Sequence, residues 1–257
     1  MTWQTVEHNG MNYYQCPELN NSQVVQACSD RSFGNMALHT GDNQVEVVRR
    51  RELFLKGLGL TLDDLVAATQ IHGTRIAVVN RSMAGYGARN PATALPDTDG
   101  LVTRERGLVL SIFTADCYPI FLYDRQTPAV GLVHAGWRGT INRIVERAVS
   151  TMTNQFGTDP RHLQVVFGPA ICGECFRVHQ EVASQFEQVY PETVHDDQLG
   201  YRVDLAEFNC RLLEDCGISR DRIINSNLCT VCTAGRFFSY RAEAGTTGRL
   251  MGIIALK

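Results

Sequence analysis

The chain has 257 residues, 44 % of them hydrophobic, a formal net charge of −3 and a pI near 6.2. Because it has no surplus of basic residues, we expect no sequence-independent nucleic-acid binding. No apolar run is long enough to cross a bilayer, which argues against a membrane partner. The first residues lack a basic flank followed by an apolar stretch, so we expect no secretory signal and a cytoplasmic location.

One domain over residues 1–257 is expected, because the sequence has no repeat, low-complexity segment or long polar linker. The first predicted helix covers residues 43–59 and ends in glycine. Residues 80–100, rich in Gly, Pro and Asn, form the most loop-like stretch, which suits either a lid or a surface excursion.

Short apolar runs predict most of the strands, and amphipathic periodicity predicts the later helices. The predicted strands are 75–80, 107–113, 119–124, 128–134, 162–168, 222–227, 237–242 and 249–256. The predicted helices are 140–157, 179–190 and 203–217, the last capped by Asp204. Some consecutive strands have no helix between them, which favours a mixed α/β or α+β fold over an alternating doubly wound sheet.

Three reactive side chains lie where apolar, strand-like runs break into small-residue turns. His72 follows LVAATQI and precedes glycine, Cys117 ends TADC, and His134 begins HAGWRG. Two histidines and a cysteine are an accepted ligand set for catalytic zinc, with a fourth position left for water or substrate, and they also suit copper. The same residues allow a different interpretation, a metal-free Cys117–His134 nucleophile pair.

Other residues near these turns have two interpretations each. Arg138 precedes the long helix and suits either an anion ligand or a surface ion pair. Asp116 is expected to close its turn rather than orient a ligand. Arg241 and Arg249 flank a glycine-rich turn in a predicted closing hairpin, which reaches a substrate phosphate or merely ends a sheet.

Nine cysteines in a chain without an export signal favour free thiols or metal ligands over disulfides. Two CxxC pairs stand out, Cys172/Cys175 and Cys229/Cys232. We favour free thiols lining or backing the site, because each pair follows a predicted strand and the pairs are far apart. A structural zinc held by all four is the alternative.

The motifs resemble those of a known family. They are GDN (41–43), QIHG (70–73), TADCYPI (114–120), HAGWRG (134–139), GPAI (168–171), Cys-Thr (229–230) and FFSYR…TTGR (237–249). In order and over nearly the whole chain they resemble the YfiH/YlmD family, also called the multicopper polyphenol oxidoreductase (laccase) family, which includes a human laccase domain-containing protein.

The resemblance implies a single-domain α-β-β-α sandwich, a fold shared with cytotoxic necrotizing factor, a bacterial toxin that deamidates glutamine. It also implies zinc at His72, Cys117 and His134, the residues that the strand-end pattern selects. Members of the family are similar to purine nucleoside enzymes, which phosphorolyse adenosine, inosine and methylthioadenosine and deaminate adenosine. The implied partners are therefore small molecules, a purine nucleoside and phosphate.

Departures from the family pattern fall at expected substrate positions. Phe33-Gly34-Asn35 replaces Ser-Leu-Asn, so only Asn35 carries over. Arg50-Arg51 replaces Asn-Arg, and Arg241-Ala242 replaces a double arginine. Asn35, Arg51, Arg138 and Arg241 are the candidate substrate-binding residues.

Four hypotheses follow, with a zinc-dependent phosphorylase and deaminase in the lead. A copper-dependent polyphenol oxidase is the second, although seven histidines, two of them in the motifs, are few for several copper centres. The third is a Cys–His amidohydrolase that edits UDP-muramoyl peptidoglycan precursors. The fourth is a non-enzymatic, zinc-stabilised binding module with a closed fourth coordination position.

Overall fold

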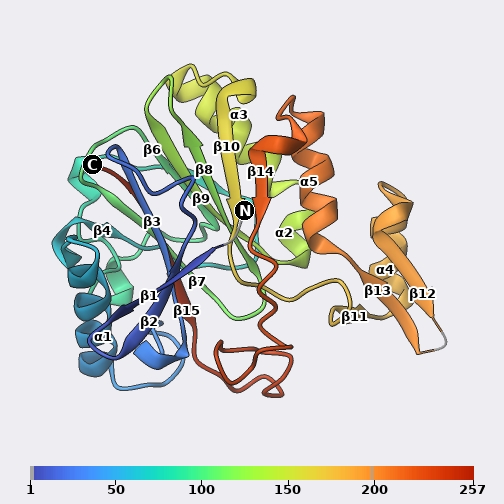
Figure 1. The fold of residues 1–257 in the computed structure, drawn as a ribbon, viewed down its shortest axis with the longest axis horizontal. Coiled ribbons are helices and arrows are strands. Elements are labelled where there is room, and N and C mark those ends of the chain that lie inside the picture. The colour runs from blue at the N-terminus through green and yellow to red at the C-terminus, as the bar shows by residue number, and fades with distance from the viewer. Residues whose placement is uncertain (1–2, 198) are drawn as a thin grey trace.

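Two six-stranded sheets form the centre of the protein in this computed structural model, which describes residues 3–197 and 199–257 (Figure 1). The first sheet has the order β1-β2-β3-β15-β7-β4, with β1 (Gln4–His8), β2 (Met11–Gln15), β3 (Val24–Ser29), β15 (Leu250–Leu256), β7 (Val109–Thr114) and β4 (Leu65–Val66). The second has the order β14-β10-β8-β9-β6-β5, with β14 (Ile223–Asn225), β10 (Leu163–Phe167), β8 (Tyr118–Asp124), β9 (Ala129–Ala135), β6 (Gly100–Thr103) and β5 (Ile76–Val78).

The two sheets pack face to face, as alternate side chains along their central strands show. In β8, Phe121 belongs to the core shared with the first sheet, whereas Ile120 and Leu122 belong to the core on the opposite face. In β15, Ile254 likewise points into the shared core and Ile253 away from it. Both faces of each sheet are therefore buried, which explains why these strands are continuous apolar runs.

Helices cover the two outer faces. The helix α1 (Gln44–Gly57) buries Phe54 and Leu55 against the outer face of the first sheet. The helices α2 (Trp137–Ile141), α3 (Ile144–Phe156) and α5 (Leu205–Asp215) lie on the second sheet, where α3 contacts β9, β5 and β6. The layers run helix, sheet, sheet, helix (Figure 1), so the expected α-β-β-α sandwich is confirmed.

A small antiparallel sheet lies to one side of the sandwich, together with α4 (Gln180–Glu187) (Figure 1). Its strands are β11 (Arg177–Val178), β13 (Gly200–Val203) and β12 (Val194–Asp197). Short 3-10 helices connect the elements: Arg31–Phe33, Leu62–Asp64, Arg81–Met83, Pro91–Thr93, Pro160–His162, Pro191–Thr193 and Arg220–Arg222.

Two sequence predictions are wrong in detail. The helix predicted over 140–157 is divided into α2 and α3, because Arg143 adopts a left-handed conformation with φ of 63° between them. The predicted closing hairpin is absent, because residues 237–249 form turns and irregular backbone. The strand that follows them is β15. The cap that Asp204 was predicted to provide is confirmed, as its side chain accepts the Glu207 N–H at 3.0 Å.

Within the described residues, no helix combines the length and the apolar character that a membrane crossing requires.

Candidate functional site

The three motif side chains meet at one place. Cys117 lies in the turn between β7 and β8, and His134 is next to the end of β9, where it pairs with Pro119 of β8. One donor atom from each of His72, Cys117 and His134 lies within 4.8 Å of the others. The two imidazole rings meet edge to face with centroids 4.8 Å apart. Residues far apart in the sequence therefore form a single three-donor cluster.

His72 does not follow a regular strand, contrary to the prediction. The strand β4 ends at Val66, and residues between it and His72 are irregular apart from an isolated bridge at Ala68. His72 itself has a φ of 60°, which non-glycine residues rarely adopt. Such backbone strain persists only where surrounding contacts impose it.

Asp99 imposes that conformation and also orients His134. Its carboxylate accepts the backbone N–H groups of Ile71, His72 and Gly73 at 3.1, 2.9 and 2.8 Å. The oxygen that accepts from His72 is also 2.8 Å from Nδ1 of His134. Because Asp99 occupies Nδ1, the other ring nitrogen, Nε2, is the one available to a metal or to Cys117.

Charge coupling within the cluster is strong. Burial raises the pKa of the Cys117 thiol, but His134 and His72 outweigh burial and lower it to about 6. Burial lowers the pKa of His134, whereas Cys117 and Asp99 raise it to about 9. A thiolate beside an imidazolium is therefore the form of the free pair near neutral pH, and a thiolate is also the form that binds metal.

Glycines in the HAGWRG motif allow the close approach that the cluster needs. A Cβ on Gly136 would lie 2.8 Å from Sγ of Cys117 and 3.2 Å from Cδ2 of His72. A Cβ on Gly139 would lie 3.2 Å from the backbone oxygen of Gly73. For steric reasons, both positions therefore favour glycine over a residue with a side chain.

The cluster opens into a cavity of about 450 Å³. Aromatic side chains form much of its wall: Phe113, Trp137, Phe176 and Tyr240. The cationic side chains of Arg138, Arg241 and Arg249 also line it, together with His39. The volume lies within the range of small-molecule sites, and the lining combines flat apolar surfaces with anion donors.

Two of the candidate arginines reach this cavity. Arg138 is exposed and stacks on Trp137, with its guanidinium carbon 4.2 Å from the ring centroid. Arg241 lines the cavity too, but it donates to the backbone oxygens of Cys175 and Arg177 at 3.3 and 3.0 Å. Arg138 lines the cavity with an exposed side chain, so its guanidinium is accessible to a ligand.

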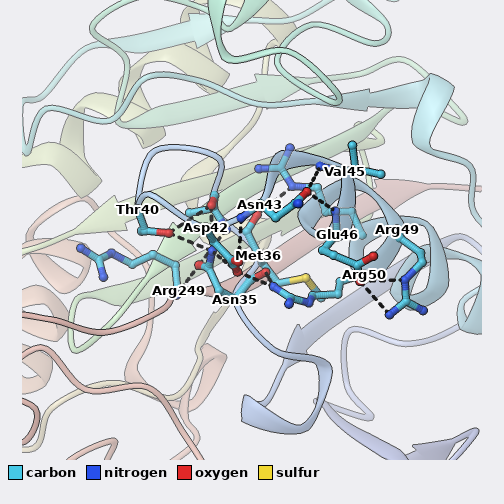
Figure 2. Close-up of polar contacts among 12 residues, drawn as sticks. Asn35, Met36, Thr40, Asp42, Asn43, Val45, Glu46, Arg49, Arg50 and Arg249 are labelled. Atoms are coloured by element: carbon cyan, nitrogen blue, oxygen red, sulfur yellow. Dashed lines mark hydrogen bonds and ion pairs between the residues drawn. The ribbon is translucent and has the colours of Figure 1, made fainter.

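Asn35 and Arg51 do not line the cavity. Asn35 is buried, donates to the Ala37 oxygen at 2.9 Å and accepts the backbone N–H of Arg249 at 3.0 Å, so it braces the residues around the cavity (Figure 2). Arg51 is 1 % exposed and donates to the backbone oxygens of Met36, Gly87 and Ala88. The structure therefore places both residues behind the cavity wall.

Asp116 has the structural role that was expected of it. It has a φ of 85°, and its carboxylate accepts the Thr230 hydroxyl at 2.6 Å and the Arg241 backbone N–H at 2.7 Å. Its backbone oxygen accepts the Ile171 N–H at 2.9 Å. It therefore ties two distant segments to the turn that carries Cys117.

Sequence reasoning missed Asp99 and His39. Asp99 stands directly before β6 and is fully buried, but neither its burial nor its contacts can be read from the sequence. His39 stands just before the GDN motif and lines the cavity. Burial and the positive charges of Arg249 and Arg51 lower its pKa, which favours a neutral imidazole.

Comparisons with known proteins give a family and several relatives. A family model described as multi-copper polyphenol oxidoreductase laccase matches residues 24–257. Purine nucleoside phosphorylase YlmD of Bacillus subtilis is 34 % identical over 254 residues, which cover 93 % of this chain and 90 % of YlmD. Adenosine deaminase RL5, from an unknown prokaryotic organism, is 36 % identical over 220 residues, 84 % of each chain. The crystal structure of YlmD from Geobacillus stearothermophilus matches with a TM-score of 0.92 and 32 % identity, covering 98 % of both chains.

Proposed function

The chain belongs to the multi-copper polyphenol oxidoreductase laccase family, and on that premise we propose that it is a zinc-dependent purine nucleoside enzyme. The proposed reactions are phosphorolysis of adenosine, inosine and methylthioadenosine, and deamination of adenosine. The observation that carries the proposal is the three-donor cluster of His72, Cys117 and His134 at the wall of an aromatic, cationic cavity. Relatives named purine nucleoside phosphorylase and adenosine deaminase support the same substrate class.

The donor set fits zinc. A thiolate and two imidazoles are a known three-ligand set with an open fourth position, and Asp99 fixes the tautomer of His134 as a carboxylate partner does in other zinc sites. When bound, zinc supplies a Lewis acid that makes water nucleophilic near neutral pH. His72, Cys117 and His134 would hold it, and Asp99 would keep both histidines in place.

The cavity residues divide the remaining tasks between base and phosphate. A purine is flat and apolar on its faces, so Phe113, Trp137 and Phe176 are suited to stack against it. In phosphorolysis a phosphate oxygen bonds to the ribose C1′ while the bond from C1′ to the purine breaks. Arg138, whose guanidinium is exposed beside Trp137, would bind and orient that phosphate.

Deamination makes a different demand on the same residues. Water oxygen replaces the exocyclic amine at C6 of adenine; one water proton goes to the amine, which leaves as ammonia, and the other remains on N1 of the product base. Neutral His39, at the cavity wall, is a group that could accept one of these protons. Phosphate takes no part in this reaction, so the arginines matter less to it.

The direct test is product analysis with purified, zinc-loaded protein. Adenosine with phosphate should give adenine and ribose 1-phosphate, adenosine alone should give inosine and ammonia, and His134→Ala should abolish both. His195→Ala, which removes an exposed histidine of β12, is the matched control and should retain activity. Release of neither base nor inosine by the wild-type protein would overturn the proposal.

The thiolate–imidazolium pair also favours a second candidate, a Cys–His amidohydrolase acting on UDP-muramoyl precursors. This activity would survive removal of zinc by a chelator, whereas the nucleoside reactions would not. A copper-dependent polyphenol oxidase, which the family description suggests, is tested by phenol oxidation with zinc-only and copper-loaded protein. Because zinc has no redox chemistry, oxidation by the copper-loaded but not by the zinc-only protein would support the oxidase, and oxidation by neither would exclude it.

A further inference from the structure

A second cluster of metal-donor side chains lies outside this site. The structure brings the two CxxC pairs together, although their nearest members are more than fifty positions apart in the sequence. The sulfurs of Cys172, Cys175, Cys229 and Cys232 all lie within 4.8 Å of one another, and those of Cys175 and Cys232 are 3.4 Å apart. Two thiolates on a tetrahedral zinc with Zn–S bonds of about 2.3 Å lie about 3.8 Å apart. The spacing of the four sulfurs therefore matches one shared ion.

Each CxxC pair forms a tight turn. The N–H of Cys175 donates to the backbone oxygen of Cys172 at 3.0 Å, and the N–H of Thr233 to that of Cys229 at 3.1 Å. Both turns point their thiols to the same side, because the isolated bridge between Ala170 and Cys229 aligns the segments.

Backbone amides surround the sulfur of Cys229. The N–H groups of Cys172 and Cys232 both donate to it at 3.4 Å. Donors that solvate a thiolate are what a thiolate metal site needs, since the ligand binds metal in its deprotonated form.

We propose that Cys172, Cys175, Cys229 and Cys232 bind a structural zinc ion, separate from the His72–Cys117–His134 cluster. Four thiolates complete a tetrahedral shell, so this site has no open position for substrate. Its two Cys-x₂-Cys pairs have the spacing of structural zinc ligands. Cys229 is buried, Cys172 and Cys175 are half-buried and Cys232 is exposed, which gives the ion an entry path.

The proposed ion would fasten two segments that build the wall of the substrate cavity. Ile171 and Phe176 line the cavity and flank the first cysteine pair. Tyr240 and Arg241 line it and follow the second pair. The Arg241 guanidinium already donates to the Cys175 backbone oxygen. A zinc ion at the four cysteines would therefore stabilise the cavity wall without contacting substrate.

Zinc analysis of protein purified under reducing conditions tests the proposal. The wild-type chain should hold two zinc ions per chain after a mild chelator wash. Cys175→Ser and Cys232→Ser should each hold one, and His72→Asn, which removes an exposed donor of the other cluster, should also hold one. Cys216→Ser removes a half-buried thiol outside both clusters and should keep two.

X-ray absorption at the zinc edge of the His72→Asn protein gives an independent measurement that needs no cysteine variant. The expected result is a shell of four sulfurs at about 2.3 Å. A shell that contains nitrogen or oxygen, iron in place of zinc, or a mass showing that these cysteines are paired as disulfides would each overturn the proposal. One zinc per chain that persists in Cys175→Ser and disappears in His72→Asn would do so as well. One zinc with the opposite pattern would support this site and contradict the proposed function.

Discussion

Replacing Asp99 by asparagine should weaken zinc binding and destabilise the fold, because this carboxylate serves both histidines. Each of its oxygens accepts two donors: one takes the His72 N–H and the His134 ring, the other the N–H groups of Ile71 and Gly73. An amide keeps the size of the side chain but has a single oxygen. Whichever way the amide is turned, its NH₂ group faces two donors that it cannot accept from.

The expected magnitudes follow from that loss. Removing the partner of a buried donor costs about 1–3 kcal/mol, so the metal-free Asp99→Asn protein should lose roughly 3 kcal/mol of unfolding free energy. Loss of a carboxylate that orients a histidine ligand weakens metal binding by about 10–100-fold. Urea unfolding measures the first quantity, and competition with a chromophoric chelator at pH 7 measures the zinc Kd.

Asp124→Asn is the matched control. Asp124 is also fully buried, and its carboxylate accepts the backbone N–H groups of Gln126 and Thr127 in the turn between β8 and β9. Both N–H groups donate to one oxygen, which an amide retains, so Asp124→Asn should change stability little and leave the zinc Kd unchanged. A zinc Kd within twofold of wild type in Asp99→Asn would refute the positioning role. An equal loss of zinc affinity in Asp124→Asn would refute it as well.

Four further predictions concern the site and its surroundings. Gly136→Ala should reduce zinc content to below half an ion at the histidine cluster by metal analysis, because the new Cβ would lie 2.8 Å from the Cys117 sulfur; a full complement would contradict this. In metal-free protein, iodoacetamide alkylation of Cys117 should have its midpoint near pH 6, and His134→Ala should move the midpoint upward. The direction follows from the pair: protonated His134 lowers the Cys117 pKa from the ordinary value of 9.0, so the reactive thiolate is lost as pH falls through 6. Arg138→Ala should raise the KM for phosphate about tenfold, the loss of roughly one charge-assisted hydrogen bond, with little change in adenosine deamination; equal losses in both reactions would exclude phosphate binding. Arg51→Met should lower the unfolding free energy by about 3 kcal/mol, because three buried carbonyl oxygens lose their donor, and leave KM values unchanged in steady-state assays.

Much of the fold could be predicted because the central strands are apolar on both faces. The runs that became β7, β8, β9, β10 and β15 are buried throughout or nearly so, and such runs are visible in a sequence. Among the strands that were missed, β1 and β11 are only partly buried, whereas β3 and β6 are fully buried but contain polar residues or span only four residues, so none gives a long apolar run. The turns at 237–249 contain the apolar pair Phe237 and Phe238, which mimics a strand but packs under irregular backbone.

The sequence could predict those site residues that are reactive and lie close to small residues. His72 and His134 are reactive side chains next to glycine or alanine, Cys117 ends TADC, and the convergence of Cys117 with His134 follows from the pairing of β8 with β9. Asp99 was not predictable, because its role depends on hydrogen bonds to a turn twenty-six to twenty-eight residues away, which the sequence does not reveal. Arg51 looked like a ligand because sequence alone does not show that its guanidinium is buried.

The contacts of Asp116 indicate which kinetic constant the second zinc site should affect. Asp116 precedes Cys117 and binds Ile171 and Thr230, the residues beside the two cysteine pairs. The proposed structural zinc would therefore bind the two segments at their cysteines, and Asp116 holds the same two segments at Ile171 and Thr230. The donor atoms of the other cluster are fixed separately, by Asp99 and by strand pairing. Loss of the structural zinc should consequently loosen the cavity wall and raise KM at temperatures where kcat and the histidine-bound zinc are still unchanged.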